Sequence, residues 1–419
     1  MPSRSTDTTI GVDEARERIL AAVSPLPVTD LPLDEALGLT LADEIVSALN
    51  LPPFDNSAMD GFALHASDTE SATPDAPAIL RVTGTIAAGH SLNTPVGPGE
   101  AIRIMTGAPI PPGADAVERV ERVATRDDDH VAIASPVNPG ENVRPAGEDV
   151  RAGDSILAAG TPVNAATIAL LAATGRAKVP VYRRPRVGVL VTGDEVVPPG
   201  APLEPGQIFN SNRPMLAALV REAGGEAVDL GTAVDDEATI RERISAAAGL
   251  DLLLTTGGVS VGDVDIVKDV LQSAGDVALW SVRIKPGKPL AFGRLDGTTV
   301  IGLPGNPVAA AVAFLQFARP AIRKMMGRRD TGLPEIEATV RDRIVNRGRR
   351  TLFGRVRIER SSGGYVATLA GAQGSAILSS LAGTHGLVVV PEDVDCLEPG
   401  DTATIQLPGW DLPPGDTGR

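Results

Sequence analysis

The chain of 419 residues has very few of the side chains that hold soft metals. It contains one cysteine, Cys396, and four histidines that are scattered along the sequence. A single cysteine excludes an internal disulfide and a zinc site built from thiolates, and the scattered histidines do not predict a histidine-metal cluster. The composition therefore excludes a large group of metalloproteins that rely on sulfur or imidazole ligands.

Long apolar runs and excess positive charge are also absent. No run approaches the roughly 18 residues that cross a bilayer, and the first residues, MPSRSTDTTIGVDEA, contain no apolar signal core. We therefore expect a cytoplasmic protein with a short disordered N-terminal tip. The net charge of −15 argues against nucleic acid and anionic membranes as partners. Positive charge is instead grouped locally, in RPRVGV, RIKPGKP and NRGRR.

Glycine (45) and proline (35) are abundant, which favours turns and short strands over long helices. The stretch PPFDNSAMDGFAL (52–64) shows this composition together with many polar groups. Pro52 and Pro53 disfavour helix and central strand, and Gly61 allows backbone angles that other residues avoid. The stretch is predicted to be a loop that carries two carboxylates, Asp55 and Asp60.

The segment 184–330 shows a regular alternation of strand and helix patterns. Near-continuous apolar strands (RVGVLVTG, EAVDLGTAV, DLLLTTGG and VIGLPG) are separated by helical patterns, and a long helix is predicted from Asn306 to Gly327. This pattern is typical of a parallel sheet that helices cover on both faces. We predict a doubly wound α/β domain at 184–330.

The flanking segments are β-rich or linking, so the fold class is multidomain α/β plus β. A helix is predicted at 12–24 and another at 164–175, with Asn164 as N-cap and Gly175 as stop. The predicted parts are a helical and linking domain at 1–50 and 146–183, a β-rich domain with the Asp60 loop at 51–145, a β-barrel-like domain at 331–408, and a disordered tail at 409–419.

The predicted α/β domain places polar loops at the carboxyl ends of its strands, where open α/β sheets bind ligands. These loops are TGDE (192–195), DD (235–236), TTGGVS (255–260) and GLPGNP (302–307). The glycine-rich loops could cradle an anion with backbone N–H groups, and the acidic loops suit Mg²⁺ bound together with phosphate. Taken singly, each glycine marks a turn and each aspartate a helix cap. Four such loops on one rim favour a nucleotide-like or phosphorylated ligand.

Lys285 and Lys288 lie close together in KPGKP, directly after a predicted strand. Lysines usually lie in solvated turns, but two of them beside a glycine-rich rim are reasonable partners for phosphate. Lys288 is followed by Pro289, so the chain lacks a P-loop lysine, and no G-x-G-x-x-G follows a strand.

A serine hydrolase is a weaker alternative. Residues 258–262 read GVSVG, which fits the G-x-S-x-G elbow, and His385 follows in the expected chain order. The elbow serine should follow its strand at once, whereas Gly257 and Gly258 intervene before Ser260.

Seven motifs, in this order and spacing, resemble the molybdopterin molybdotransferase family, which includes MoeA and the E domain of gephyrin. The motifs are PPFDNSAMDGFAL, RIMTGAPIPPGAD, NVRPAGEDV, TGDEVV, TTGGVSVGDVD, KPGKPLAFG and GLPGNPVAA. The resemblance covers residues 10–408. It implies a doubly wound molybdopterin-binding domain flanked by N-terminal α+β and β-rich domains and a C-terminal β-barrel-like domain.

The resemblance also implies a reaction. Adenylylated molybdopterin and molybdate would be the substrates, AMP would leave, and Mg²⁺ would be required. The sulfurs that hold molybdenum would belong to the substrate, which agrees with the lack of a cysteine or histidine cluster. The family forms an elongated homodimer whose active cleft lies between the α/β domain of one subunit and the N-terminal domains of the other.

The family's functional residues can be matched to this sequence by motif. Asp60, Thr106 and Asp149 would reach across the dimer interface. Glu195, Asp235 and Asp265 match carboxylates of the sheet rim, and the first two would hold Mg²⁺. The predicted ligand-binding residues are Gly257, Gly258, Ser260, Lys285, Lys288, Pro304, Pro307 and Ser375. One position departs from the family pattern, because Ser281 stands where a lysine is common.

Two other functions remain open alternatives. The adenylyltransferase that makes the intermediate shares the α/β core, although its loop usually reads GGTG where this chain reads GGVSVG. A non-enzymatic scaffold like gephyrin is the second alternative. Transient contact with the adenylyltransferase and with molybdoenzyme chaperones is also expected.

Overall fold

The computed structural model describes residues 8–90, 95–127, 129–257, 270, 273, 275–295 and 297–409. The chain divides into two compact units. Unit 1 comprises Met1–Asp30, Gly38–Ala42 and Pro180–Arg419, and unit 2 comprises Leu31–Leu37 and Asp43–Val179. The predicted N-terminal tip and the predicted tail lie wholly or largely outside the described residues, as does most of the helical pattern DIVKDVLQSAG (265–275), one of those that separate the predicted strands.

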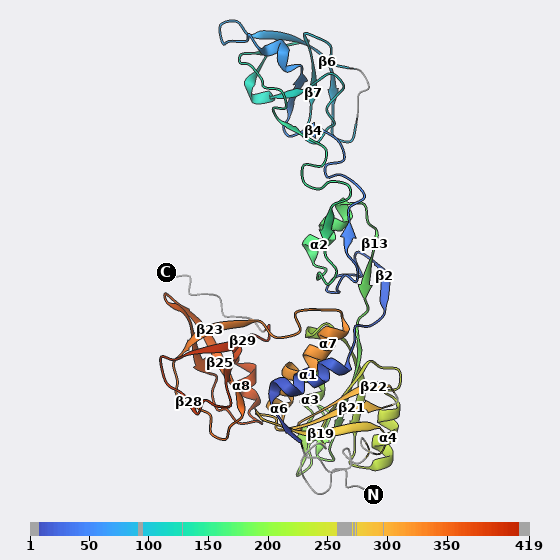
Figure 1. Ribbon diagram of the computed structural model, residues 1–419, viewed down its shortest axis with the longest axis vertical. Helices are drawn as coiled ribbons and strands as arrows, with labels where there is room; N and C mark the ends of the chain where they lie inside the picture. The colour runs from blue at the N-terminus through green and yellow to red at the C-terminus, as the bar shows by residue number, and fades with distance from the viewer. Residues whose placement is uncertain are drawn as a thin grey trace. The chain divides into compact units, whose positions relative to one another are not determined.

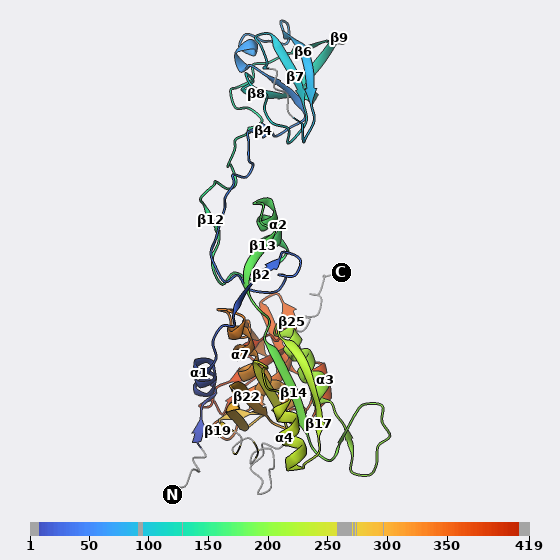
Figure 2. The same ribbon diagram turned by 90° about the vertical axis from the view of Figure 1, so that its right-hand side faces the viewer.

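Unit 1 contains a seven-stranded sheet in the order β1-β19-β21-β22-β18-β14-β17 (Figures 1 and 2). Its strands are β1 (Thr8–Ile10), β14 (Arg186–Thr192), β17 (Glu226–Ala233), β18 (Leu252–Thr256), β19 (Asp276–Val282), β21 (Pro289–Leu295) and β22 (Thr298–Leu303). Four neighbouring strands of this sheet are parallel to one another, in the order β17, β14, β18 and β22. The doubly wound sheet is therefore confirmed, but β21 runs antiparallel to both β19 and β22, which the sequence pattern did not indicate.

Helices cover both faces of this sheet. On one face, α1 (Val12–Ala22), α3 (Asn212–Glu222), α6 (Pro307–Ala313) and α7 (Arg319–Met325) form one layer (Figure 1). On the other face, α4 (Glu237–Ser245) packs Ile240 and Ile244 into a core with sheet residues such as Leu253. Successive crossovers on opposite faces are what the predicted strand and helix alternation requires.

The long predicted helix is present but contains one wide turn. Between α6 and α7 lies the π-helical segment η3 (Phe314–Ala318). Pro320 has no N–H with which to bond the carbonyl of Gln316, and this carbonyl instead accepts a hydrogen bond from Arg16 Nε (3.3 Å). Proline near the centre of a helix accounts for the interruption.

Two predicted helix caps are also present. At the start of α2 (Ala165–Ala173), Asn164 accepts a hydrogen bond from the Thr167 backbone N–H (2.9 Å). At the start of α4, Asp236 accepts from both the backbone N–H and the hydroxyl of Thr239 (2.9 Å each). Asp236 is therefore a structural cap, and its neighbour Asp235 is left without this role.

The C-terminal part of unit 1 is a closed barrel of five strands, as predicted. The strands are β23 (Glu335–Val340), β25 (Thr351–Ser361), β26 (Gly364–Leu369), β27 (Gly386–Val390) and β29 (Thr402–Gln406), and β25 also pairs with β27 to close the ring. The short strand β20 (Ile284–Lys285) pairs with β25. This pairing joins the KPGKP segment to the barrel. The remaining short elements are β15 (Val196–Val197), β16 (Ile208–Phe209), β24 (Ile344–Val345), β28 (Cys396–Leu397) and α8 (Leu378–Ala382).

Unit 2 contains a six-stranded sheet in the order β8-β5-β7-β6-β10-β9. Its strands are β5 (Gly61–Leu64), β6 (Ala78–Ile86), β7 (Glu100–Ile104), β8 (Ala116–Arg119), β9 (Val123–Asp127) and β10 (His130–Ile133). Unit 2 also contains the two-stranded pairs β3 (Ile45–Val46) with β12 (Ser155–Leu157) and β4 (Asn56–Ser57) with β11 (Val143–Arg144). The strands of a further pair, β2 (Val28–Pro32) with β13 (Lys178–Tyr182), have residues in both units. The short 3₁₀ segments are η1 (Ala66–Thr69) and η2 (Val120–Arg122).

The stretch 52–64, which was predicted to be a loop throughout, instead contains the short strand β4 and ends in β5, which is buried on both faces. Phe62 and Leu64 enter one apolar cluster and Ala63 enters a second one. A Cβ atom at Gly61 would lie 2.0 Å from the carbonyl oxygen of Glu118, so only glycine fits there. The core of unit 2 thus fixes the end of the loop.

Candidate functional site

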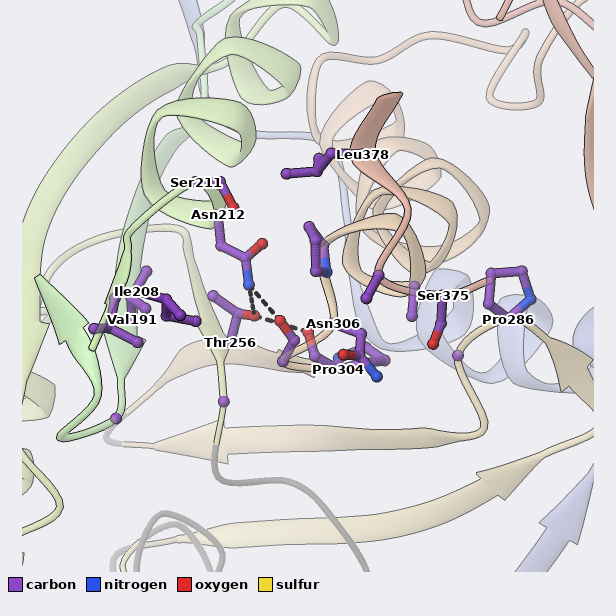
Figure 3. A pocket seen from close by; sticks show the side chains of 18 of the residues that line it. Val191, Ile208, Ser211, Asn212, Thr256, Pro286, Pro304, Asn306, Ser375 and Leu378 are labelled. Carbon is purple, nitrogen blue, oxygen red and sulfur yellow. Dashed lines mark hydrogen bonds between the residues drawn. The ribbon is translucent and has the colours of Figure 1, made fainter. Parts of the chain in front are cut away.

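A cleft of about 990 Å³ opens in unit 1 at the carboxyl ends of β14, β18 and β22 (Figure 3). All of its lining residues belong to unit 1, and they come from the α/β domain, the KPGKP segment and the barrel. The cleft lies where the parallel strands and the loops after them meet, which agrees with the general position of ligands in open α/β sheets. Its volume is suited to a nucleotide-sized ligand.

Acidic side chains occupy one rim of the cleft. Glu195 and Asp235 both line it, and Asp194 accepts a hydrogen bond from the Asp235 backbone N–H (2.9 Å). Burial, together with the negative charges of Asp194 and Glu195, raises the pKa of Asp235 above its usual value. The negative charges are thus close enough to disfavour one another, which a bound cation would relieve.

The acidic rim fits a Mg²⁺ ion that is bound by one or two protein carboxylates together with water and substrate phosphates. Glu195 and Asp235 form no ion pair with any described residue. Within the described ranges, no group of three or more carboxylate, histidine or cysteine side chains is arranged to hold a metal ion alone. Mg²⁺ commonly takes one or two protein carboxylates and completes its shell with water and substrate phosphates. Two carboxylates that face an open cleft meet that need.

Basic side chains line another wall. Lys285 is half-buried, Lys288 is exposed, and Arg350 is half-buried, and all three line the cleft. Lys285 reaches this wall because β20 pairs with β25 of the barrel. Arg350 comes from the NRGRR segment, directly before β25. The cleft therefore carries positive charge on one wall and negative charge on its acidic rim.

Backbone turns bring the remaining predicted residues to the floor. Gly257, Pro304, Pro307 and Ser375 line the cleft. Gly257 has a φ of +91°, and a Cβ atom there would lie 2.5 Å from the Thr192 carbonyl oxygen, so glycine is required.

A hydrogen-bonded chain fixes the amide of Asn212, which sequence reasoning did not single out. Its Nδ2 donates to the Gly305 carbonyl (2.7 Å) and to Thr256 Oγ1 (3.1 Å), and Thr256 Oγ1 donates to the Pro304 carbonyl (2.8 Å) (Figure 3). Because the Gly305 carbonyl can only accept, the amide oxygen must point the other way. That oxygen and Thr192 Oγ1 are buried polar atoms with no hydrogen-bond partner among the described residues.

The barrel wall depends on Arg355, which is fully buried. Its guanidinium donates to the carbonyls of Ala372 (3.1 Å) and Gly374 (3.0 Å), and burial lowers its pKa. Gln373 is held by two hydrogen bonds to the backbone of Arg355 (2.8 and 3.1 Å). These contacts fix the loop that carries Ser375. A charged residue in the alternating strand GRVRIERS would ordinarily be assigned to the exposed face, so the burial of Arg355 could not be predicted from this pattern.

The Asp60 loop in unit 2 forms a second polar group. Asp60 accepts hydrogen bonds from the backbone N–H (2.7 Å) and the hydroxyl (2.9 Å) of Thr106, and these bonds lower the pKa of Asp60. Asp55 accepts from the Ala146 backbone N–H (2.7 Å). The structure therefore brings together Asp60 and Thr106, which lie far apart in the sequence.

Several predicted site residues are not joined to these groups. Asp149 is exposed in unit 2, where its backbone N–H donates to the Leu51 carbonyl (2.9 Å), and its side chain forms no hydrogen bond with a described residue. Gly258, Ser260 and Asp265 lie outside the described residues.

The alternative signals behave as structural features. His385 accepts a hydrogen bond from the Ile358 backbone N–H (3.0 Å) and does not line the cleft. Ser281 is buried in β19 and does not line the cleft either. Among the described helices, none has the length and apolarity needed to cross a membrane.

Comparison with known families covers most of the chain. Residues 10–175 match a family described as the MoeA N-terminal region (domain I and II), residues 188–324 match a probable molybdopterin binding domain, and residues 337–407 match the MoeA C-terminal region (domain IV). A Mycobacterium tuberculosis protein named molybdopterin molybdenumtransferase 2 is 43% identical over 396 residues, which is 92% of this chain and 95% of the relative. The chain belongs to the MoeA family.

Other MoeA relatives agree in sequence and in fold. A Haemophilus influenzae protein named molybdopterin molybdenumtransferase is 37% identical over 403 residues, covering 94% of this chain and 98% of the relative. The crystal structure of a molybdopterin biosynthesis MoeA protein from Pyrococcus horikoshii covers 96% of this chain and all (100%) of its own, with 32% identity and a TM-score of 0.83. The resemblance carried by the seven motifs is thereby confirmed.

Proposed function

We propose that this MoeA family member is a molybdopterin molybdotransferase. It would insert molybdate into adenylylated molybdopterin and release AMP in a reaction that requires Mg²⁺. The observation that carries the proposal is the cleft of unit 1, where acidic and basic side chains line one cavity of about 990 Å³. The names of the relatives and the match to a probable molybdopterin binding domain support the same substrate class.

The basic wall would bind the anionic parts of the substrates. Lys285, Lys288 and Arg350 can pair with the phosphate oxygens of the adenylylated substrate and with molybdate. When the bond between the two phosphates breaks, negative charge grows on the departing AMP phosphate. Cations already fixed in the cleft stabilise that charge without further rearrangement.

The acidic rim would hold Mg²⁺ through Glu195 and Asp235. When bound, Mg²⁺ neutralises charge on the substrate phosphates during their separation. The residues themselves contribute the binding site, which lies in the same cleft as the basic side chains. Asp235 is free for this role because the neighbouring Asp236 caps α4.

In the proposed reaction, molybdenum would be bound by the sulfurs of the substrate and not by side chains of the protein. Cys396, the single cysteine of the chain, does not line the cleft, and its thiol donates to Glu398 (3.3 Å) in the barrel region. Molybdate would therefore enter as an oxyanion on the basic wall and then bind to the dithiolene group of molybdopterin.

A homodimer would complete the site. Asp60 and Thr106, together with Asp149, would face the cleft of a partner subunit and supply a carboxylate whose ionised state Thr106 stabilises. The protein would act in the cytoplasm, with transient contacts to the adenylyltransferase before it and to molybdoenzyme chaperones after it.

The test is AMP release by purified protein with adenylylated molybdopterin, molybdate and Mg²⁺. AMP release should require both molybdate and Mg²⁺, and Lys288→Ala should slow it by about tenfold or more. The matched control is Lys178→Ala, which removes an exposed lysine of β13 that does not line the cleft. The proposal is wrong if no AMP appears, or if the protein instead releases pyrophosphate from ATP and molybdopterin, as an adenylyltransferase would.

A further inference from the structure

The cleft contains an apolar surface that the proposed charge chemistry does not use. The two residues of β16, Ile208 and Phe209, line the cleft and are 55% and 44% exposed. Aromatic residues make up 3% of the chain. Among the described residues, the exposed aromatic side chains are Phe54, Phe209 and Tyr365, and of these only Phe209 lines the cleft. Large apolar groups left open in a ligand cavity usually contact the ligand.

Backbone hydrogen bonds, rather than a core, hold this surface in place. The Ile208 backbone N–H donates to the Glu195 carbonyl (2.8 Å), and the Asn210 backbone N–H donates to the Val197 carbonyl (2.8 Å). The Asn210 side chain donates to Thr232 Oγ1 in β17 (3.0 Å) and accepts from the Arg213 backbone N–H (2.9 Å). Both side chains of β16 are therefore presented at a fixed place without being needed for packing.

Two polar atoms of residues that line the cleft, Asn212 Oδ1 and Thr192 Oγ1, are buried without a hydrogen-bond partner among the described residues. Because both atoms are inaccessible, they do not select the ligand. The exposed Phe209 ring is the feature that favours a planar ring, since an aromatic face binds such a ring by stacking.

We propose that Phe209, with Ile208, is the surface on which the heterocycle of the substrate stacks. The ring class is a planar nitrogen heterocycle, either the pterin or the adenine of adenylylated molybdopterin, and this choice rests on the proposed function. Stacking against an aromatic face contributes binding affinity that does not depend on the charge of the ligand. Phe209 would thus select substrates by their ring, while the basic wall selects them by their phosphates.

The experiment measures the binding of separate probes to the full-length protein. AMP and pterin each contain a ring, whereas pyrophosphate and molybdate contain none. Phe209→Ala should weaken the binding of AMP or of pterin by about tenfold, since stacking is worth roughly that much per ring. Phe209→Trp should restore it, and the affinities for pyrophosphate and molybdate should stay unchanged. The matched control is Leu203→Ala, which removes a side chain that is 49% exposed and does not line the cleft.

The outcomes separate the two ring sources and the two proposals. A loss confined to AMP places adenine on Phe209, and a loss confined to pterin places the pterin there. Equal ring affinities for wild type and Phe209→Ala, or no ring binding by wild type, would overturn the inference. A protein that binds rings through Phe209 but never releases AMP keeps this inference and loses the proposed function. Normal AMP release, together with ring affinities that Phe209→Ala leaves unchanged, would support the proposed function and overturn this inference.

Discussion

The surroundings of the carboxylates in the Asp60 loop of unit 2 and in the acidic rim of unit 1 have opposite effects on the carboxylate pKa. Asp60 receives two hydrogen bonds from Thr106, which lower its pKa. Asp235 lies near Asp194 and Glu195, and burial and these charges raise its pKa. One carboxylate is stabilised as an anion by its own chain, and the other is destabilised as an anion until a cation arrives.

This difference suggests a division of roles. Because the charge of Asp60 is already stabilised, Asp60 needs no ligand to remain ionised and would supply a permanent negative charge in the proposed site. A carboxylate crowded by its neighbours gains most from a metal ion, so Asp235 is the better candidate for cation binding. In the proposed site the same residue type would therefore serve two functions, because the surrounding donors and charges differ.

The largest expected effect comes from separating the two regions onto different subunits. Asp60→Asn and Glu195→Gln should each reduce AMP release by about a hundredfold or more, because each removes a charge from the proposed site. In a dimer with shared sites, a mixed dimer has one cleft with both changes and one with neither. Mixing the two inactive variants should therefore restore up to about half of the activity per mixed dimer.

The control for this experiment is a mixture of Glu195→Gln with Asp235→Asn, whose changes lie in the same cleft. Every cleft of that mixed dimer carries one change, so its activity should not exceed the average of the two variants measured separately at the same Mg²⁺ concentration. Mass measurements must show that subunits exchange. If they do exchange and the Asp60 and Glu195 mixture stays inactive, the Asp60 loop does not complete the cleft of a partner.

A smaller effect should distinguish two adjacent aspartates within the acidic rim. Asp235→Asn should raise the Mg²⁺ concentration needed for AMP release by about tenfold, since a carboxylate ligand is lost, without lowering the melting temperature. Asp236→Ala removes the cap of α4, so it should lower the free energy of unfolding by about 1 kcal/mol and leave the Mg²⁺ requirement unchanged. If both variants change the same quantity, the assignment of cap and metal ligand is incorrect.

Much of this arrangement could be predicted from the sequence because it follows local rules. Apolar strands separated by helical patterns predicted the doubly wound sheet, and polar residues before helices predicted the caps at Asn164 and Asp236. Loops after parallel strands must gather at one edge, so Glu195 and Asp235 could be expected to lie together. The lysines of KPGKP, Lys285 and Lys288, were singled out from the sequence as partners for phosphate, and both line the cleft.

The features that were missed depend on contacts between distant segments. The antiparallel direction of β21 follows from how the chain returns after β19, which periodicity does not show. The wide turn in η3 depends on Pro320 and a hydrogen bond from Arg16. Arg355 lies in a strand whose alternation predicts exposure, yet it is buried because the loop at Gly374 covers it with carbonyl groups.

The smallest expected effect is the pH dependence of stability, which should have opposite signs for the two carboxylates. The folded pKa of Asp60 lies below the ordinary value of 3.8, so its ionised form stabilises the folded state above that pH. This contribution is lost as the pH falls through the folded pKa. Asp60→Asn should therefore melt below wild type at neutral pH, and the difference should shrink as the pH falls below that value.

For Asp235 the folded pKa lies above the ordinary value of 3.8, so the ionised form destabilises the folded state above the folded pKa. Asp235→Asn should therefore melt above wild type at neutral pH, and this gain should vanish as the pH falls through the folded pKa toward 3.8. Mg²⁺ at neutral pH should also remove the gain, because the cation stabilises the wild-type carboxylate but not the amide. Melting curves of wild type and both variants across this pH range, with and without Mg²⁺, provide the measurement. If both variants change the melting temperature in the same direction, the two regions do not differ in how they stabilise charge. If Asp235→Asn still melts above wild type in the presence of Mg²⁺, Asp235 does not belong to the cation site.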